Sequence, residues 1–487
     1  MIRTVLLAMA VPAAAALTVV PIAGATGRGV VSAVFFGAAV VLGAIAYLAH
    51  RWSSSDGERP EPVRLGLVAA TWIAVALVTS AVTWTAILMS PASAGAPALR
   101  DPLSALFESI SGLSTTGLTV VDDSGVIEEW LQWWRTVLQW VGAFGVVLFA
   151  VTVAEPSGDH DTLIGSDWGE APGGDALETA RRLVGILAVI TALSVVAMIV
   201  VGEPVWRAVN HGMTAAATGG FSVATNSAGD SGPAVRVILA ATLVVSAMAF
   251  GTLWDRARRV GLPLWRRTQV RYGFGATVIC VAVALLVRDG SPAGDVVFNS
   301  ISASTTGGFS VGSSYSSVQA LSGVAMVSMF IGGAAGSTAG GIKAARLAWL
   351  TKAAARWLPG RSDLDDDVTY RWDGGDVGRD DARHRIMGAA AIVVTWLMIV
   401  SIGTVVMAAH NPNLAISDVL FEAFSAGSGV GLSSGLTAET LDATTKLTLS
   451  TLMLAGRVEM TAFVVLLVGP FVKAADSATS SSIDPTP

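Results

Sequence analysis

LFESISGLSTTGLT, at residues 106–119, has three counterparts further along the chain: VNHGMTAAATGGFS at 209–222, VFNSISASTTGGFS at 297–310 and LFEAFSAGSGVGLS at 420–433. Alignment on the last glycine of each stretch superposes Gly117, Gly220, Gly308 and Gly431. Each of these glycines is followed by Leu or Phe and then by Thr or Ser. A single stretch would be explained by small residues packed between helices. Four matched copies, each between two apolar segments, indicate one structural unit repeated four times.

A proline precedes every aligned glycine at a similar distance. Pro102, Pro204, Pro292 and Pro412 lie 15, 16, 16 and 19 residues before the glycine of their repeat. Proline suits the first turn of a helix, where its missing N–H is not needed, and a polar residue before it can cap the helix. Candidate caps are Asp101, Ser291 and Asn411, and Ser417-Asp418 offers a competing start in the fourth repeat. Each repeat is therefore predicted as a membrane span, a half-helix, a Gly/Thr loop and a second span.

The composition indicates that lipid is the main solvent. Of 487 residues, 53% are hydrophobic and 14% charged, whereas soluble domains carry roughly 25% charged residues. A crossing needs about 20 apolar residues, and ten segments qualify: 5–22, 31–50, 65–89, 131–153, 180–201, 235–254, 272–287, 318–331, 386–409 and 447–472. The predicted fold is an all-α integral membrane protein with about ten crossings, in which two N-terminal helices precede four span–loop–span repeats around a central pore.

The distribution of basic residues predicts the orientation. Cytoplasmic loops carry an excess of Lys and Arg. With the N terminus in the cytoplasm, the inner loops 51–65, 154–182, 254–271 and 343–385 hold 20 Lys and Arg, and the outer segments hold seven. We therefore expect a multi-pass protein of the cytoplasmic membrane with a cytoplasmic N terminus. The first segment is alternatively a signal peptide, because Arg3 precedes a short apolar run, and this would leave the later orientation unchanged.

The repeated unit suits a cation pore. A half-helix that ends near the membrane centre directs its negative C-terminal end at a cation. Non-helical backbone is tolerated at that depth only where it lines a cavity, and rings of carbonyl oxygens can replace the hydration shell of an ion. Glycine permits the positive φ angles that such a loop needs. The candidate filter residues are Ser114, Thr115, Thr116, Gly117, Ala217, Thr218, Gly219, Gly220, Thr305, Thr306, Gly307, Gly308, Ser428, Gly429, Val430 and Gly431.

Other function classes find less support in the residues. The chain has one cysteine, Cys280, and five histidines without a zinc-binding spacing, and no basic patch interleaved with aromatic residues that would suit nucleic acid. The sequence contains no P-loop motif and no Rossmann βαβ unit, so no bound organic cofactor is expected in this chain. A sodium- or proton-coupled carrier for a cation or solute remains an alternative, because broken helices also build transporter sites. An intramembrane enzyme is a third alternative, but the spans contain no converging nucleophile and base.

These motifs resemble the superfamily of bacterial Trk and Ktr potassium transporters, relatives of the fungal Trk and plant HKT proteins, over nearly the whole chain. The two spans before the first repeat are more similar to the TrkH type than to the KtrB type. The resemblance implies four M1–loop–M2 units around one pore. It also implies potassium as the transported ion, because glycine stands at position 117 where serine is associated with sodium passage. The fourth filter, Ser428-Gly429-Val430-Gly431, departs most from the STTG pattern.

The stretch IGGAAGSTAGGIK at 331–343 interrupts the span after the third filter. Five glycines in residues 332–341 would each destabilise a helix by about 1 kcal/mol relative to alanine. A plain helix is therefore not expected, and a closely packed glycine face is the alternative to a functional loop. The resemblance implies a mobile gate loop below the filter. Its candidate residues are Gly332, Gly333, Gly336, Ser337, Thr338, Gly340, Gly341 and Lys343.

Arg457 lies near the middle of the last predicted span. It is roughly 20 Å from either end at 1.5 Å per residue, too far for its side chain to reach the membrane surface, so it is a candidate functional residue. The resemblance implies an arginine that projects into the pore as a barrier to ion flow, and so adds Arg457 to the gate. Glu459 is expected on the opposite side of this helix, paired with a neighbouring helix.

Two groups of side chains are expected on the outer side. Acidic residues either raise the local cation concentration or are simply solvated; they are Glu108, Asp122, Asp123, Glu128, Glu129 and Glu422. Tryptophans at the start of the fourth span are typical of an aromatic belt at the membrane surface; they are Trp130, Trp133, Trp134 and Trp140.

The predicted organisation follows the repeats. Its boundaries are 1–64 for the two N-terminal helices, 65–155, 156–260 and 261–356 for repeats 1 to 3 (the third including the gate loop), 357–385 for a cytoplasmic loop, 386–475 for repeat 4 and 476–487 for a disordered tail. The resemblance implies a homodimer in the lipid bilayer, with a TrkA-like nucleotide-binding regulatory subunit on the cytoplasmic face.

Overall fold

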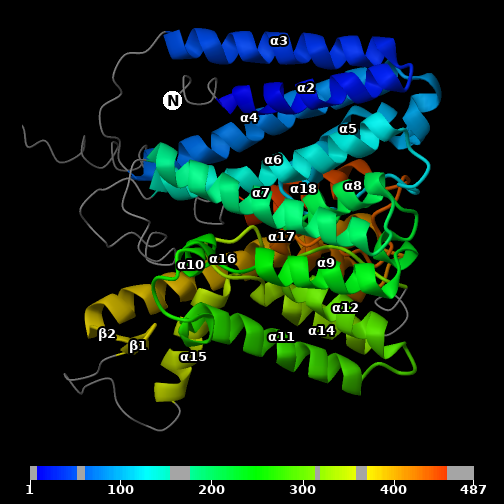
Figure 1. Ribbon diagram of the computed structural model, residues 1–487. Helices are drawn as coiled ribbons and strands as arrows, with labels where there is room; N and C mark the ends of the chain where they lie inside the picture. The colour runs from blue at the N-terminus through cyan, green and yellow to red at the C-terminus, as the bar shows by residue number, and fades with distance from the viewer. Residues whose placement is uncertain (1–7, 52–60, 154–175, 313–318, 358–369, 458–487) are drawn as a thin grey trace, which may run out of the picture.

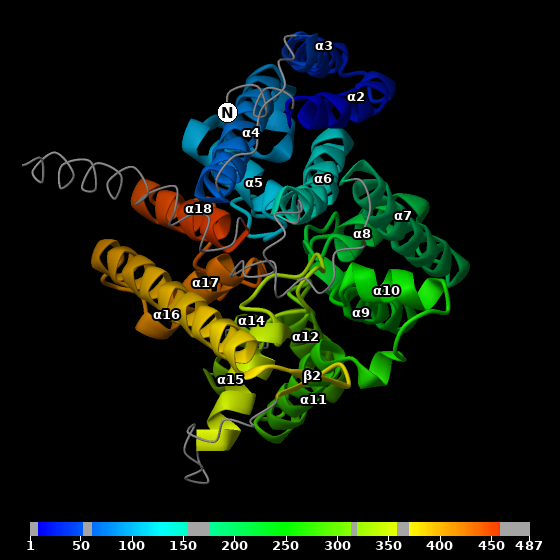
Figure 2. The ribbon, with the colours of Figure 1, turned by 90° about the vertical axis from the view of Figure 1, so that its left-hand side faces the viewer.

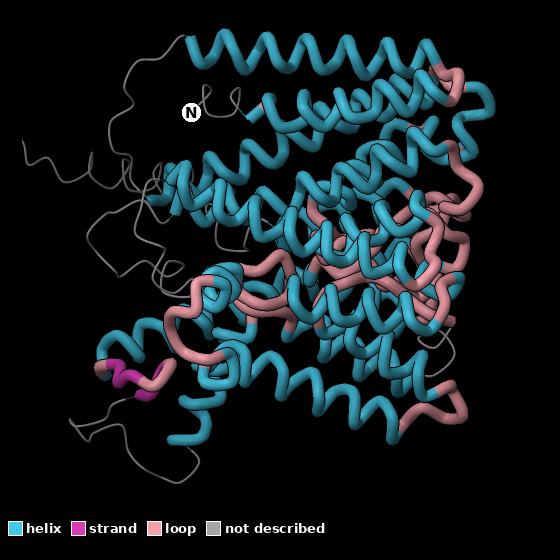
Figure 3. The backbone as a smooth tube through the Cα atoms, viewed as in Figure 1, coloured by secondary structure: helices cyan, strands magenta, loops and turns pink. Residues whose placement is uncertain are grey.

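The computed structural model describes residues 8–51, 61–153, 176–312, 319–357 and 370–457. These residues form a bundle of helices around a central group of loops (Figures 1 and 3). The all-α prediction is confirmed for the membrane part. The one strand pair among the described residues is a small antiparallel hairpin, β1 (Tyr370–Trp372) with β2 (Gly375–Val377), within the predicted cytoplasmic loop. The predicted tail 476–487, Glu459 and the second half of the last span lie outside the described residues.

In chain order, the described helices fall into the predicted N-terminal pair and the four predicted units as follows. The N-terminal pair is α2 (Ala10–Ala25) and α3 (Gly29–Arg51). The first unit contains α4 (Glu61–Leu88), η1 (Pro91–Gly95), η2 (Pro97–Arg100), α5 (Pro102–Leu113) and α6 (Glu129–Val153). The second contains α7 (Ala176–Val200), α8 (Val205–Ala216), η4 (Ser227–Asp230), α9 (Pro233–Ser246) and α10 (Phe250–Ala257). The third contains η5 (Leu264–Arg266), α11 (Thr268–Leu286), α12 (Ala293–Ser304), α14 (Gln319–Ile331) and α15 (Ala344–Trp357). The fourth contains α16 (Arg379–His410), α17 (Ile416–Ser428) and α18 (Ala443–Arg457).

Five described helices are long and apolar enough to cross a membrane: Gly29–Arg51, Ala69–Leu88, Arg181–Val200, Thr268–Leu286 and Arg379–His410. A sixth is obtained if α9 and α10, which are bent by 98°, count as one span. Two further predicted crossings correspond to the shorter apolar helices Ala10–Ala25 and Gln319–Ile331. The total of about ten crossings stays a prediction, because several of the expected spans extend beyond the described residues.

The four half-helices are α5, α8, α12 and α17. Asp101 caps α5 as predicted, because its carboxylate accepts hydrogen bonds from the N–H groups of Leu103 (3.3 Å) and Ser104 (3.2 Å). Pro204 and Pro292 stand at the N-cap of their helices, so Ser291 is not a cap. The fourth half-helix begins at Ile416, close to the competing start at Ser417-Asp418.

Asn411 is therefore not the cap of the fourth half-helix. Its amide instead donates to Asp442 Oδ2 (3.2 Å) and Thr445 Oγ1 (2.9 Å), which tie the end of α16 to the start of α18. The proline at position 412 thus ends the preceding helix.

Seen end-on, the four units follow one another around the centre (Figure 2). The fourth unit closes the circle on the first: α18 packs against α5, and Lys446 Nζ lies 3.0 Å from Asp101 Oδ2. All four half-helices consequently end near one axis.

The N-terminal hairpin packs outside this circle, against α6. Phe35 of α3 lies edge-on to Trp130 and Trp134, at 5.8 and 5.0 Å between ring centroids. Both tryptophans are buried. The predicted aromatic belt is wrong for these two residues, because their rings fill the contact between the hairpin and α6 rather than facing lipid.

Candidate ion pore

The four half-helices end in the same backbone geometry. Two residues before the aligned glycine the backbone is left-handed in every repeat, with φ +55° at Thr115, +51° at Thr218, +54° at Thr306 and +65° at Gly429. The N–H of the following residue donates to the carbonyl five residues earlier, at 3.0 Å for Thr116, 2.8 Å for Gly219, 2.7 Å for Gly307 and 2.9 Å for Val430. This is a Schellman C-cap. The left-handed conformation is unfavourable by about 1–2 kcal/mol for a residue that has a β-carbon. Three threonines in this conformation therefore indicate that the surrounding structure imposes the turn.

The four aligned glycines then close a ring. Each has positive φ and lies against the loop of the next repeat around the axis, so a β-carbon would collide there. A Cβ would be 2.2 Å from the oxygen of Gly219 if built on Gly117, 2.8 Å from that of Gly307 on Gly220, 2.3 Å from that of Val430 on Gly308 and 2.0 Å from that of Thr116 on Gly431. The structure thus brings the four predicted filter loops together in cyclic order, with room only for glycine at the closest approach.

A polar side chain on each half-helix forms hydrogen bonds with the residues that follow the aligned glycine of its predicted filter loop. The residue nine positions before the aligned glycine forms a hydrogen bond with a residue two or three positions after that glycine. We call these four half-helix residues the filter clasp. They are Glu108, His211, Asn299 and Glu422. The clasp was not among the predicted site residues. Its signal was present in the aligned stretches, because the third letter of each one is polar.

The clasp contacts recur with different chemistry. Glu108 Oε2 accepts from Val120 N (3.3 Å), and Glu422 Oε1 accepts from Ser434 N (3.0 Å). Asn299 exchanges two 2.9 Å bonds with the backbone of Val311, and His211 Nε2 lies 2.9 Å from Ser222 Oγ. All four clasp residues are buried. The loops are therefore fixed on both sides of the ring glycine.

Glu108 also belongs to a buried ion pair. Arg135 Nε donates to Glu108 Oε1 at 2.7 Å, and both side chains are 2% exposed. The same guanidinium donates to Ser124 Oγ (2.9 Å) and Thr119 Oγ1 (3.1 Å) and lies 4.1 Å above the ring of Phe221. Arg135 thus connects the first filter to the second.

Two of the six acidic residues expected on the outer side are neither solvated nor available to attract cations. Glu108 and Glu422 are buried and bonded to their own filters. Glu128 forms an ion pair with Arg28 at 2.8 Å. Asp122 and Glu129 are exposed, as a solvated or cation-attracting role requires.

Gln139 of α6 supports the second filter from behind and was not predicted. It is fully buried, its amide donates to Gly219 O (2.5 Å) and its carbonyl oxygen accepts from Phe221 N (3.1 Å). A Cβ on Gly219 would lie 2.4 Å from the Gln139 side chain. The glycine before the ring position is thus required by a side chain from another helix.

Residues 332–343 connect α14 to α15 without forming a helix, as predicted. Gly332, Gly336 and Gly341 have positive φ. The glycines are also closely packed, since a Cβ on Gly332 would lie 2.1 Å from Gly340 O. The expectation of an irregular loop is confirmed, and the close glycine packing that was the alternative to a functional loop is present as well, so the gate stays a prediction.

This loop lies against the C-terminal ends of the second, third and fourth half-helices. Gly340 N donates to Thr306 Oγ1 (2.7 Å), and Gly341 N donates to Ser428 O (3.0 Å). Thr338 Oγ1 lies 3.3 Å from Ala216 O. The loop of the third unit thus contacts filter residues of the third and fourth units and the end of the second half-helix.

Arg457 joins this loop to the first unit. Its Nη1 donates to Thr338 O (3.0 Å) and its Nη2 to Gly142 O (2.7 Å). The guanidinium also lies 5.9 Å from the centre of the Trp72 ring. The predicted gate residues and the arginine are therefore in direct contact, although they are 119 positions apart.

Re-entrant half-helices that meet in a ring of loops, within a bundle of apolar helices, define a membrane transport protein. The family model described as TrkH, cation transport protein, matches residues 34–261 and 282–475, and the chain belongs to this family. It is thus a multi-pass membrane protein and not an enzyme.

Named relatives agree with this assignment. The chain is 31% identical, over 54% of its length, to the Trk system potassium uptake protein TrkH of Halomonas elongata, and the match spans 57% of that relative. It is 25% identical to an uncharacterized cation transporter of Methanocaldococcus jannaschii over 76% of both chains. The chain thus spans little more than half the length of the TrkH relatives it matches. The crystal structure of the potassium transporter TrkH from Vibrio parahaemolyticus shares the fold, with a TM-score of 0.80 over 96% of this chain and 98% of that one at 22% identity.

Proposed function

We propose that this protein takes up potassium ions across the cytoplasmic membrane through the ring of four filter loops. The observation that carries the proposal is the cyclic contact among Gly117, Gly220, Gly308 and Gly431. Four half-helices direct the negative ends of their dipoles at this centre, and backbone carbonyls there can replace the water around a cation. The relatives named for potassium uptake and the glycine at position 117 support potassium as the ion.

Residues 332–343 are proposed as the gate, with Lys343 at its end. The loop is held against the filter by hydrogen bonds to Thr306, Ser428 and Ala216, which suits a closed state. Opening would break these bonds and the two contacts of Arg457. The glycines with positive φ provide the conformational freedom for such a movement.

The remaining assignments rest on the basic loops and on the family likeness. We propose a cytoplasmic N terminus, a homodimer in the bilayer, and a TrkA-like nucleotide-binding subunit that controls the gate from the cytoplasmic side. The excess of Lys and Arg in the predicted inner loops supports this orientation.

Expression in a bacterium that lacks its own potassium uptake systems tests the function. We expect growth in low-potassium medium, which the empty vector does not allow. Absence of growth with confirmed membrane expression, both alone and with a co-expressed regulatory subunit, would refute potassium uptake.

Arg457→Ala is expected to increase ion flux through the reconstituted protein by about tenfold. The variant removes two charge-assisted hydrogen bonds that hold the loop, and a difference of 1.4 kcal/mol between closed and open states is a factor of ten. Flux is measured in proteoliposomes at a fixed membrane potential. Arg457→Lys is the matched control, because lysine keeps the positive charge but cannot form both hydrogen bonds, to Thr338 O and to Gly142 O, in the same geometry.

The two variants distinguish between two roles of Arg457: holding the loop through its hydrogen bonds, and opposing ion flow through its charge. If the contacts of Arg457 hold the gate, both variants conduct faster. If only its charge matters, Arg457→Lys behaves as the wild type. A well-folded Arg457→Ala protein that conducts no faster than wild type would contradict both roles.

A further inference from the structure

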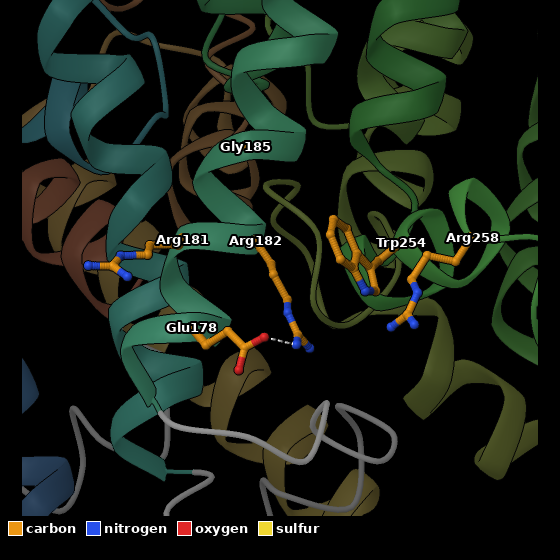
Figure 4. Close-up of a pocket in the computed structure, with 6 residues that line it drawn as sticks. All are labelled: Glu178, Arg181, Arg182, Gly185, Trp254 and Arg258. Atoms are coloured by element: carbon orange, nitrogen blue, oxygen red, sulfur yellow. Dashed lines mark hydrogen bonds and ion pairs between the residues drawn. The ribbon is translucent and has the colours of Figure 1, made fainter.

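A basic pocket lies between the start of α7 and the helix α10. It has a volume of about 570 Å³ and is lined by Glu178, Arg181, Arg182, Gly185, Trp254 and Arg258. The helix α10 is bent by 98° from α9, and Trp254 of α10 and its C-cap Arg258 face the start of α7 (Figure 4). No part of the proposed transport mechanism uses these residues.

Among the described residues, the lining of the pocket holds three arginines and a single acid, Glu178. Arg182 pairs with Glu178 and lies 5.5 Å from the centre of the Trp254 ring. In Figure 4, Arg182 and Arg258 point into the space beside Trp254, whereas Arg181 points to the other side of α7. Arg258 is exposed, and no acidic group among the described residues pairs with it. The indole N–H of Trp254 is buried and lacks a hydrogen-bond acceptor among the described residues.

The pocket lies at the edge of an apolar surface. The stretch Arg181–Val200 has a mean hydropathy of 2.8, and only 17% of it is buried inside the protein. Val189 and Leu193 on this helix are 58% and 67% exposed. Two arginines thus mark the end of a lipid-facing helix, which is the level at which phospholipid headgroups lie.

We propose that this pocket binds the headgroup of an anionic phospholipid. The phosphate would lie between Arg182 and Arg258 and accept a hydrogen bond from the indole N–H of Trp254. The acyl chains would run along the exposed apolar face of α7. Arginine pairs with phosphate through two parallel N–H donors, and basic pockets between membrane helices bind anionic headgroups. The combination of cationic donors with an adjoining apolar face fits a lipid better than a soluble anion.

The bend between α9 and α10 also contacts the predicted gate loop. Phe250 N donates to Gly336 O (2.8 Å), and Ala334 N donates to Ala247 O (2.9 Å). A lipid that stabilises the bend would therefore also stabilise this position of the loop. This consequence rests on the proposed function, whereas lipid binding itself does not.

Thermal unfolding of the purified full-length protein in neutral detergent tests the proposal. Addition of dioleoylphosphatidylglycerol is expected to raise the wild-type Tm by roughly 2–4 °C relative to dioleoylphosphatidylcholine. Arg182→Gln/Arg258→Gln should lose most of this rise. Arg266→Gln is the matched control: Arg266 is exposed, carries the same charge and does not line the pocket, so this variant should keep the rise. Trp254→Phe retains the ring but not the N–H, and an intermediate loss is expected.

Three results would overturn the proposal. The wild type could gain no stability from the anionic lipid, as it would if acidic protein segments occupied the pocket. Arg266→Gln could lose the response as fully as the double variant, which would mean a general charge effect. Inorganic phosphate at millimolar concentration could stabilise the wild type as much as the lipid, which would assign the pocket to a soluble anion. None of these readouts depends on ion transport.

Discussion

Gly117→Ser is expected to lower the ratio of potassium to sodium flux by at least about tenfold, which corresponds to 1.4 kcal/mol of discrimination. Gly117 has φ +96°, and its Cβ would lie 2.2 Å from Gly219 O. A serine must therefore displace the second filter or move its own loop outward. In either case the arrangement of the carbonyl ring changes, and the size of such a ring and the number of carbonyls in it govern the choice between the two ions. The ratio is measured with both ions in the same batch of proteoliposomes.

Gly435→Ser is the control for backbone strain. Gly435 has nearly the same φ, +101°, but a Cβ there meets nothing within 4 Å. It is expected to share the strain of about 1–2 kcal/mol and to leave the flux ratio unchanged. If Gly117→Ser conducts normally with an unaltered ratio, the first loop does not set selectivity and its assignment as a filter is wrong.

Arg135→Met is expected to destabilise the protein by about 3–5 kcal/mol, because it leaves the buried carboxylate of Glu108 without its cation. The pair is joined at 2.7 Å and both side chains are 2% exposed. The measurement is the free energy of unfolding in detergent. Arg28→Met is the control, since Arg28 forms the partly exposed pair with Glu128, and pairs of that kind contribute about 0–1 kcal/mol.

The double variant Arg135→Met/Glu108→Leu separates stability from filter position. Replacing both charges by apolar groups of similar volume should recover most of the stability. It also removes the bonds from Glu108 to Thr119 and Val120, so ion selectivity should be lower than in the wild type. Recovery of both stability and selectivity would mean that the clasp of the first filter does not position it.

The clasp extends this argument to the whole pore. Two carboxylates, one imidazole and one amide perform the same task in four repeats, and one of them is paired with an arginine from α6. The ring glycines are alike, whereas the groups that hold them differ. The proposed pore therefore combines four loops of similar backbone geometry with supporting side chains that differ, so the same substitution in different loops should have unequal effects.

Much of the ring could be predicted from the chain alone, because its determinants are local. Glycine at 117, 220, 308 and 431 permits a positive φ that other residues adopt only at a cost, and apolar runs of sufficient length predict membrane spans without knowledge of their neighbours. The glycine-rich stretch 332–341 similarly excluded a plain helix. These signals determined the repeat, the position of the loops and the interrupted span.

Contacts between distant segments were decided only by the packing of the helices. The aligned repeats showed that position 108 is polar, but not that Arg135 would form an ion pair with it. An exposed acidic residue on the outer side was predicted there instead. Trp130 and Trp134 likewise carry the pattern of a membrane belt, yet the N-terminal hairpin buries them through Phe35. Arg457 was identified by its depth in a span, whereas its acceptors, Thr338 O and Gly142 O, come from other units. Backbone preferences act within a few residues and are written in the sequence, but the partner of a buried charge is whichever group the assembled bundle brings within bonding distance.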